Sequence, residues 1–368
     1  MKVLSIFGTR PEAIKMAPVV RELSTRADIQ STVCVTAQHR EMLDQVLDLF
    51  AIKPDVDLNL MRPNQSLAEL TARVFTHLDP VLDKIKPDWV LVQGDTTTVM
   101  AAALNAYYRR IRVGHVEAGL RTHNKWEPFP EEINRRVAGV AADLHFAPTR
   151  WSRQNLLKEG VPEEQIHVTG NPVIDALKFV AEQPVPATVA KLLSTYESKR
   201  IVLVTAHRRE NFGEPLENIC EALLSLAERD DVQIVYPVHL NPNVQEPVKR
   251  LLGDVPNITL LRPLEYLPLV HLMKNADLIL TDSGGIQEEA PAFGVPVLVL
   301  RDVTERPEGV QAGTLKLVGT NAKKIVNEAN YLLNDRLAHA AMAQAVNPFG
   351  VGDSAKKIVD TLLRFDKA

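Results

Sequence analysis

The sequence is poor in cysteine, in long apolar runs and in excess charge of either sign, and each shortage excludes a class of protein. Only two cysteines occur, Cys34 and Cys220, each inside an apolar segment, so we expect buried free thiols rather than a disulfide framework. The apolar run in MKVLSIFG is too short for a signal peptide or a membrane span, which favours a cytoplasmic protein. The net charge of -4 gives no strong field that would attract nucleic acid or an anionic membrane.

Several motifs of metal and cofactor sites are also missing. The chain has no HExxH and no CxxC, and its carboxylates do not cluster as magnesium sites usually do. It has neither the GxGxxG of dinucleotide-binding folds nor the GxxxxGK[ST] of a P-loop. We therefore expect no metal and no cofactor, and a chemistry that depends on side chains acting on a phosphate-bearing ligand.

What the sequence does contain is a regular alternation of apolar runs and amphipathic stretches. In 368 residues, 45% hydrophobic and 24% charged, this predicts a globular α/β protein of about two domains. Runs such as VLSIF, WVLVQGD and RVGHVEA predict buried parallel strands, and stretches such as HREMLDQVLDLF predict the crossover helices. The pattern breaks over residues 181–199, where QPVPAT suggests a linker, and then restarts with RIVLVTA and VQIVYPV.

The fold expected is therefore two Rossmann-like, doubly wound domains facing a central cleft. We place the first domain at residues 1–172, joined by the C-terminal helix at 354–368, and the second at 173–353. Ligands of such sheets bind beyond the carboxyl ends of the strands, so the residues that follow each strand are the candidates for function.

Charged side chains gather at the strand ends of the first domain. The corner FGTRPEAIK follows the first strand, and the segments QGDTTT, HVEAGLRT and EPFPEEINRR follow later ones. Together they carry three bases and three acids: Arg10, Lys15, Arg121, Asp95, Glu117 and Glu131. Bases can neutralise a phosphate, and paired carboxylates can exchange protons with a substrate. Each residue alone could equally be a helix cap or a solvated charge, as Asp95 before TTT and Glu131 at a helix start illustrate.

The second domain offers a different set of strand ends. The segment LTDSGGIQEEA runs from a strand through Ser283, Gly284 and Gly285 into a helix, and small residues there expose backbone N–H groups to an anion such as a diphosphate. Glu289 follows at a distance suited to ribose hydroxyls. Two further strands end in histidines, and two arginines add positive potential nearby: His207, His239, Arg208 and Arg209. SGG alone is often only a tight turn, and a single histidine is more often structural than functional.

Taken in order along nearly the whole chain, these segments resemble a known family. FGTRPEAIKMAP, QGDTTT, GHVEAGLRT, PEEINRR, HRRENFG, YPVHLNPNV, TDSGGIQEEAP and RDVTERPE are similar to the motifs of the non-hydrolysing UDP-N-acetylglucosamine 2-epimerases. The resemblance implies a fold like that of GT-B glycosyltransferases. It also implies interconversion of UDP-N-acetylglucosamine and UDP-N-acetylmannosamine by a homodimer, for polysaccharide biosynthesis.

The resemblance assigns roles to residues of this chain. The proton transfers fall to Asp95, Glu117 and Glu131. Arg10, Lys15 and His207 attend the diphosphate, and His207 is counted with the acids among the catalytic residues. Nucleotide binding falls to Ser283, Gly284, Gly285, Glu289 and Arg306. In some bacterial relatives a second UDP-N-acetylglucosamine binds as an activator, and the matching positions are Gln38, Glu41, Arg208 and His239, together with Glu131.

The chain departs from the family pattern near the expected uracil contact. Leu269, in EYLPLV, stands where many relatives carry phenylalanine, and Leu264 replaces a more polar residue of some relatives, one turn upstream. Backbone recognition of the base would survive these changes, but aromatic packing on it would be lost.

Three other functions stay open at this point. A hydrolysing epimerase would run the same elimination with water and release N-acetylmannosamine and UDP. A retaining glycosyltransferase follows from the fold alone, and fold does not fix function. A non-catalytic nucleotide-sugar sensor would keep SGG and Glu289 but would need none of Asp95, Glu117 or Glu131.

Overall fold

The computed structural model of the chain describes residues 1–36, 40–62 and 65–367. Its contacts divide the chain into two compact units: unit 1 is Met1–Ala176 with the chain from Phe349 onward, and unit 2 is Leu177–Pro348. The chain leaves unit 1 inside helix α7 (Pro172–Ala181). The limits expected from the sequence, 172 and 354, differ from these bounds by a few residues, because Asp175 of α7 accepts hydrogen bonds from the N–H groups of Ser354 and Ala355.

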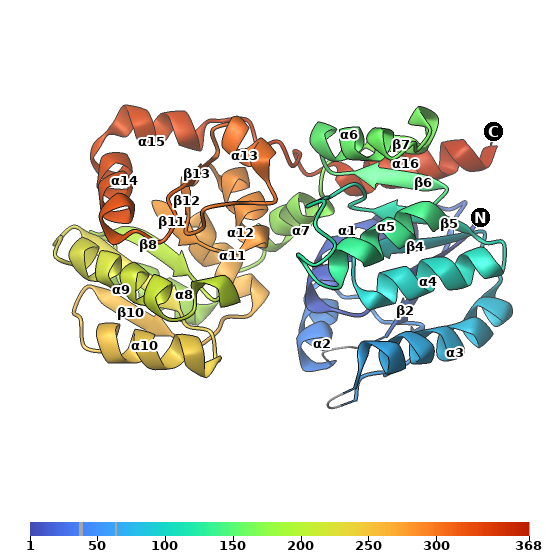
Figure 1. The fold of residues 1–368 in the computed structure, drawn as a ribbon, viewed down its shortest axis with the longest axis horizontal. Helices are drawn as coiled ribbons and strands as arrows, with labels where there is room; N and C mark the ends of the chain where they lie inside the picture. Colours follow the sequence, from blue (N-terminus) through green and yellow to red (C-terminus); the bar gives the residue numbers. More distant parts are fainter. Residues whose placement is uncertain (37–39, 63–64, 368) are drawn as a thin grey trace. The chain divides into compact units, whose positions relative to one another are not determined.

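Unit 1 is built on a parallel sheet with the strand order β3-β2-β1-β4-β5-β6-β7 among the described residues (Figure 1). Its strands are β1 (Lys2–Phe7), β2 (Gln30–Val35), β3 (Val56–Asp57), β4 (Trp89–Gln93), β5 (Arg112–Val116), β6 (Leu144–Ala147) and β7 (Ile166–Val168). Its helices besides α7 are α1 (Arg10–Ser24), α2 (Arg40–Leu49), α3 (Leu67–Ile85), α4 (Thr97–Tyr108), α5 (Glu131–Ala141), α6 (Arg150–Lys158), the short η1 (Glu163–Gln165) and α16 (Ser354–Lys367).

Unit 2 repeats this plan, with the order β10-β9-β8-β11-β12-β13 in its described sheet. Its strands are β8 (Arg200–Thr205), β9 (Val232–Pro237), β10 (Ile258–Leu261), β11 (Leu278–Thr281), β12 (Val297–Val299) and β13 (Leu315–Leu317). Its helices are α8 (Ala187–Thr195), η2 (Arg209–Asn211), α9 (Glu214–Ala227), α10 (Pro242–Leu252), α11 (Tyr266–Lys274), α12 (Gly284–Glu289), η3 (Ala290–Phe293), α13 (Pro307–Gln311), α14 (Ala322–Asn334) and α15 (Arg336–Ala343). The segment QPVPAT runs into the start of α8, so only part of it is a linker.

The strands are buried on both faces, as their continuous apolar sequences predict. Every residue of β4 is buried, and helices α3, α4 and α5 pack side by side over one core cluster of unit 1 (Figure 1). In unit 2, α9, α10 and α14 cover a second cluster. Both strand orders are those of a doubly wound sheet, so the predicted α/β class with two Rossmann-like domains is confirmed.

The strand order locates the switch point of each sheet, where chain connections diverge to opposite sides. In unit 1 it lies between the neighbouring strands β1 and β4, and in unit 2 between β8 and β11. Ligands of open α/β sheets bind beyond the carboxyl ends of the strands at such points. The corners after these four strands are therefore the places to look for function.

Among the described residues, none of the helices combines the length and the apolar composition that crossing a bilayer requires. Cys34 and Cys220 are free and buried, as expected.

Candidate functional site

The corner after β1 is held in shape by a buried glutamate. Glu12 accepts hydrogen bonds from the N–H groups of Gly8 (2.9 Å) and Thr9 (2.7 Å) and from the hydroxyl of Thr96 (2.6 Å) on the corner after β4. Thr9 completes a capping box at the start of α1. Gly8 is required, because a Cβ there would lie 2.0 Å from Oγ1 of Thr36. Glu12 thus joins the two strand ends at the switch point.

This corner presents two cationic side chains in the first turns of α1. Arg10 is the first residue of the helix and is half-buried. Lys15 follows just over one turn later, and its ammonium group forms an ion pair with the carboxylate of Glu117. The base-rich corner predicted from FGTRPEAIK therefore contacts one of the predicted acids directly.

Glu117 lies directly after β5, in a left-handed backbone conformation with φ of +63°. Its side chain is buried, and three N–H donors reach its carboxylate. Lys15 and Nδ2 of Asn171 (2.9 Å) bind Oε1, and Nε2 of Gln93 binds Oε2. A left-handed conformation is uncommon for a residue with a Cβ and marks a constrained position. Donors converging on one carboxylate favour its ionised form.

Asp95 lies on the corner after β4, and its environment differs from that of Glu117. Nη2 of Arg135 donates to its carboxylate at 2.6 Å. Burial nevertheless raises the pKa of Asp95, Arg135 opposes this, and the charges of Glu117 and Glu131 raise the pKa further. The alternative that Asp95 caps α4 is wrong, because Thr96 is the N-cap and accepts from the N–H of Val99.

Glu131 is the first residue of α5, and its effect on the pKa of Asp95 places it in the same electrostatic group. The preceding Pro130 makes no side-chain cap. Its neighbour Glu132 is buried and accepts from the N–H groups of Thr122 and His123, both at 3.1 Å, so it orders the loop before α5. Asp95, Glu117, Glu131 and Lys15 therefore form one cluster in unit 1, which we call the acid cluster.

Arg121 binds a partner that the sequence analysis did not identify. It was grouped with the acids at the strand edge, but its guanidinium binds both carboxylate oxygens of Glu159, at 2.9 and 2.8 Å. Bidentate pairs of this kind fix geometry. Arg121 therefore ties the segment after Glu117 to the end of α6, and we assign it no ligand.

In unit 2, the corner after β8 is organised by Asp282, which directly follows β11. This buried carboxylate accepts from the N–H groups of His207 and Arg208, both at 2.8 Å, and from Nδ2 of Asn211 at 3.0 Å. The ring of His207 lies 3.5 Å from Asp282 and stacks on His239 with centroids 5.6 Å apart. Burial lowers the pKa of His207, against the attraction of Asp282. The two predicted strand-end histidines therefore lie together.

The SGG segment begins helix α12 as predicted. Ser283 is the N-cap residue, and among the described residues its side chain makes no cap hydrogen bond. The guanidinium of Arg306 lies over the Cα of Gly284, where a Cβ would come within 2.8 Å of Nη1. Arg306 also donates to Glu288 (2.8 Å) and Glu305 (2.7 Å). A side chain larger than hydrogen at Gly284 would therefore displace this arginine.

Glu289 is the last residue of α12, and its buried carboxylate accepts a hydrogen bond from the hydroxyl of Tyr266 at 3.0 Å. Leu269 is half-buried on α11 beyond Tyr266. Leu264, also half-buried, precedes the helix, so the expectation that it lies one helical turn upstream of Leu269 is wrong.

The four positions matched to a second ligand are described only in part. His239 and Arg208 lie at the ends of unit 2 strands, as given above. Gln38 lies outside the described residues, and Glu41 belongs to α2 without a described side chain.

The residues that support the site were missed by the sequence analysis: Gln93, Arg135, Asn171, Tyr266 and Asp282. Gln93 and Asp282 stand inside segments that had been singled out, QGDTTT and TDSGG, beside the residues chosen. Arg135 stands four residues after Glu131, the spacing of side-chain neighbours on a helix. Asn171, in VTGNPV, carried no signal of its own.

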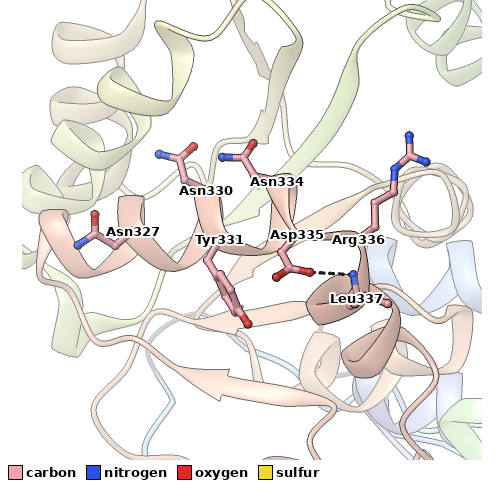
Figure 2. A pocket seen from close by; sticks show the side chains of 7 residues that line it. All are labelled: Asn327, Asn330, Tyr331, Asn334, Asp335, Arg336 and Leu337. Carbon is pink, nitrogen blue, oxygen red and sulfur yellow. Dashed lines mark hydrogen bonds between the residues drawn. The ribbon is translucent and has the colours of Figure 1, made fainter.

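Figure 2 shows a hollow on the surface of unit 2 that the sequence analysis did not single out. It is lined by residues of α14 and the start of α15: Asn327, Asn330, Tyr331, Asn334, Asp335, Arg336 and Leu337. Asn330 and Asn334 accept hydrogen bonds from Arg229, at 2.7 and 2.9 Å, so two of its amides already bind the protein itself. We assign this hollow no ligand.

Within the described residues, no group of three or more histidine, cysteine or acidic side chains is arranged to hold a metal ion. Each unit therefore carries its own candidate features: unit 1 has the acid cluster near its switch point, and unit 2 has a helix start with a buried carboxylate near its own. Two Rossmann-like units with these features define an α/β enzyme of the GT-B type.

Comparison with known proteins gives the family. A family model described as UDP-N-acetylglucosamine 2-epimerase matches residues 21–363. A curated Ralstonia solanacearum protein named "Probable UDP-N-acetylglucosamine 2-epimerase" is 58% identical over 364 residues, covering 97% of each chain. The chain belongs to the UDP-N-acetylglucosamine 2-epimerase family, and the enzyme class predicted from its motifs is confirmed.

Solved structures agree with this assignment. The crystal structure of UDP-GlcNAc 2-epimerase from Neisseria meningitidis, bound to UDP-GlcNAc, is 53% identical, with a TM-score of 0.91 over 99% of this chain and 100% of that one. An S. aureus structure with UDP is 48% identical, with a TM-score of 0.90 over 100% of this chain and 97% of that one.

Proposed function

We propose that this chain interconverts UDP-N-acetylglucosamine and UDP-N-acetylmannosamine without net hydrolysis. The hydrogen on carbon 2 of the sugar is not acidic enough for simple removal, because no carbonyl lies next to that carbon. The route we propose begins with loss of UDP from carbon 1 as a base removes this proton, which leaves 2-acetamidoglucal. UDP then adds back to carbon 1, while carbon 2 receives a proton on the opposite face.

The acid cluster is the observation that carries this proposal. Two proton transfers on opposite faces need at least two groups whose environments differ. Glu117 receives several N–H donors, which suits a base, whereas burial raises the pKa of Asp95, which suits an acid. Glu131 supplies a third carboxylate from a separate element. A sensor that only binds a nucleotide sugar would need none of them.

The leaving diphosphate needs positive charge and N–H donors as it departs. We assign this role to Arg10, Lys15 and His207, with the SGG segment at the start of α12 and Arg306 beside it. UDP in the S. aureus relative and UDP-GlcNAc in the Neisseria relative support a ligand of this kind. Leu264 and Leu269 are assigned to the uracil ring of the nucleotide.

Incubation with UDP-N-acetylglucosamine in deuterated water, followed by NMR, tests the reaction. The proposal predicts deuterium on carbon 2 of both UDP-sugars, because each passage through the glucal replaces that hydrogen with one from solvent. A hydrolysing epimerase would instead accumulate free N-acetylmannosamine and UDP. Absence of both exchange and product would contradict catalysis and favour the sensor.

Changing Glu289 to alanine is expected to weaken UDP binding by roughly 1.5–3 kcal/mol, the usual range for a hydrogen bond to a charged group. The reason is loss of the carboxylate that we assign to the ribose hydroxyls. Calorimetric titration with UDP measures it. The matched control is Tyr266→Phe, which removes the hydroxyl bound to Glu289 but keeps the carboxylate. If Glu289→Ala binds UDP normally while folded, the ribose role is wrong.

Three further expectations stay proposals. Gln38, Glu41, Arg208 and His239, with Glu131, would receive a second UDP-N-acetylglucosamine that activates the enzyme. The chain would act as a homodimer, and it would act in the cytoplasm.

A further inference from the structure

Asn171 is a buried residue outside the segments that the sequence analysis singled out, and it contacts the acid cluster. It lies between β7 and α7 with an exposed fraction of 0%. Its Nδ2 donates to Oε1 of Glu117 at 2.9 Å. Its Oδ1 accepts from the N–H of Val173 at 3.1 Å, and its own N–H donates to the carbonyl of Phe349 at 2.7 Å. Both ends of the amide and the backbone are therefore engaged.

These bonds connect Asn171 to the two segments at which the chain leaves unit 1 and returns to it. Val173 lies in the first turn of α7, inside which the chain leaves unit 1, and Phe349 is the first residue after its return. The segments touch closely: a Cβ on Gly170, whose φ is +84°, would lie 3.1 Å from the carbonyl oxygen of Phe349 and 2.7 Å from Oγ of Ser354. Asn171 is thus held where the segment leading into α7 packs tightly against the segment that begins at Phe349.

The neutral amide of Asn171 differs from the cationic donor on the same oxygen, Lys15. Lys15 also binds Oε1 of Glu117, but its ammonium sits on a flexible stem and is assigned to the diphosphate as well. An amide cannot lose its proton in this pH range, and the packing around Asn171 fixes its direction. Lys15 is thus shared between two assigned roles, whereas both hydrogen bonds of the Asn171 side chain are made within the protein.

We propose that Asn171 is a positioning residue for the reaction, which fixes the orientation of Glu117 from the segment where the chain crosses between the two units. This inference rests on the proposed function, because it takes Glu117 to be one of the groups that exchange a proton with carbon 2. Asn171 itself touches no substrate in this account. It acts through Glu117.

The sharpest test is Asn171→Asp, which keeps the size, the backbone bond and the acceptor for Val173. It replaces the donor to Glu117 with a second carboxylate. We expect kcat to fall roughly ten- to a hundred-fold, the equivalent of one hydrogen bond to a charged group, with little change in KM. Asn171→Ala should lower kcat similarly.

The pH profile separates positioning from mere support of the fold. Titratable groups that already interact with Glu117 include Lys15, Asp95 and His115. A new carboxylate beside Glu117 makes its ionised form less favourable, so the acidic limb of kcat against pH should move to higher pH in Asn171→Asp. Asn171→Ala removes the donor but adds no charge, so its acidic limb should move less than that of Asn171→Asp.

Asn105→Asp is the matched control. Asn105 is likewise buried in unit 1, with 2% of its surface exposed, and its Nδ2 donates to the carbonyl of Phe75 on α3 at 3.0 Å. We expect it to lower the melting temperature while kcat per folded molecule and the pH limb stay unchanged. If Asn171→Asp behaves like Asn105→Asp, the positioning role is overturned. Deuterium exchange by the unchanged enzyme tests the proposed function separately, since that result does not depend on Asn171.

Discussion

Asp95→Asn, Glu117→Gln and Glu131→Gln should each slow epimerisation by about a hundred- to ten-thousand-fold, the usual worth of a positioned acid or base. Each change keeps the shape of the side chain and removes its titrating group. Elimination and re-addition both move a proton at carbon 2, on opposite faces, so one carboxylate does not easily serve both steps. The three come from different corners of one sheet, after β4, after β5 and at the start of α5. UDP should still bind to all three variants.

At least one of these variants should release 2-acetamidoglucal and UDP, because elimination survives while re-addition stalls. Product analysis by NMR or chromatography detects both compounds. This outcome is specific to the proposed route, since a protein that was only destabilised would lose all activity together. Turnover near normal in all three variants would show that these carboxylates are caps and surface charges, and the mechanism would be wrong.

Glu159→Gln provides a control for the loss of a carboxylate as such. Glu159 is an exposed acid of the same unit, and its charge pairs with Arg121 rather than with the acid cluster. Removing it breaks an ion pair and should cost some stability, with turnover per folded molecule within a few-fold of normal.

Local sequence patterns predicted the fold because buried parallel strands have a strong local signature. Runs such as WVLV are apolar throughout, and the burial of β4 on both faces is what a doubly wound sheet demands. Once the strands are ordered, parallel topology brings their carboxyl ends to one edge, so Asp95, Glu117 and the corner at Lys15 fall together. Two-residue β3 had no such signature, because a strand that short has no period to detect.

The contacts that decide roles within the site could not be predicted in this way, because they join residues far apart in the chain. Asp95 could be a cap or a partner of Arg135, and only the packing of α5 beside α4 settles that it is the partner. Asn171 reaches Glu117 across 54 residues of sequence. Arg121 looked like a phosphate ligand by its position, but Glu159 at the end of another helix binds it. The charge of a side chain in the sequence therefore identifies a candidate site residue, but its role depends on the partner that it contacts in the fold.

The second large effect we expect is loss of stability in mild acid. It comes from two buried histidines on β5 and β6 of unit 1. His115 on β5 and His145 on β6 are register partners in adjacent strands, and both are buried with 1% of their surface exposed. Burial lowers the pKa of His115 to about 4, against a hydrogen bond to the carbonyl of Gly94 at 2.7 Å. Burial, followed by the charge of His115 and of Arg121, lowers the pKa of His145 to about 3.

The sign of the effect follows from where protons bind. An unfolded histidine titrates near pH 6.5, whereas these two stay neutral in the folded protein down to about pH 4. Between these limits the unfolded chain binds more protons, so the free energy of unfolding falls as the pH falls. Each histidine contributes about 1.4 kcal/mol per pH unit once the unfolded form is fully protonated, so the pair should remove about 4 kcal/mol between pH 7 and pH 5.

Other groups of the unit act in the opposite direction, so the test compares variants instead of using the unchanged protein alone. Burial raises the pKa values of Glu12, Asp95 and Asp175, and such acids bind protons in the folded state first. His145→Leu removes one histidine and leaves these acids in place. The difference in unfolding free energy between pH 7 and pH 5 should shrink by about 2 kcal/mol in this variant.

Chemical denaturation followed by tryptophan fluorescence measures this difference on the right part of the chain, because all three tryptophans, Trp89, Trp126 and Trp151, belong to unit 1. Ser5→Ala is the control: this buried hydroxyl on β1 does not titrate, so its loss should change stability equally at both pH values. If His145→Leu and the unchanged protein lose the same free energy between pH 7 and pH 5, His145 is not held neutral by burial. The acid sensitivity of the unit would then have to come from elsewhere.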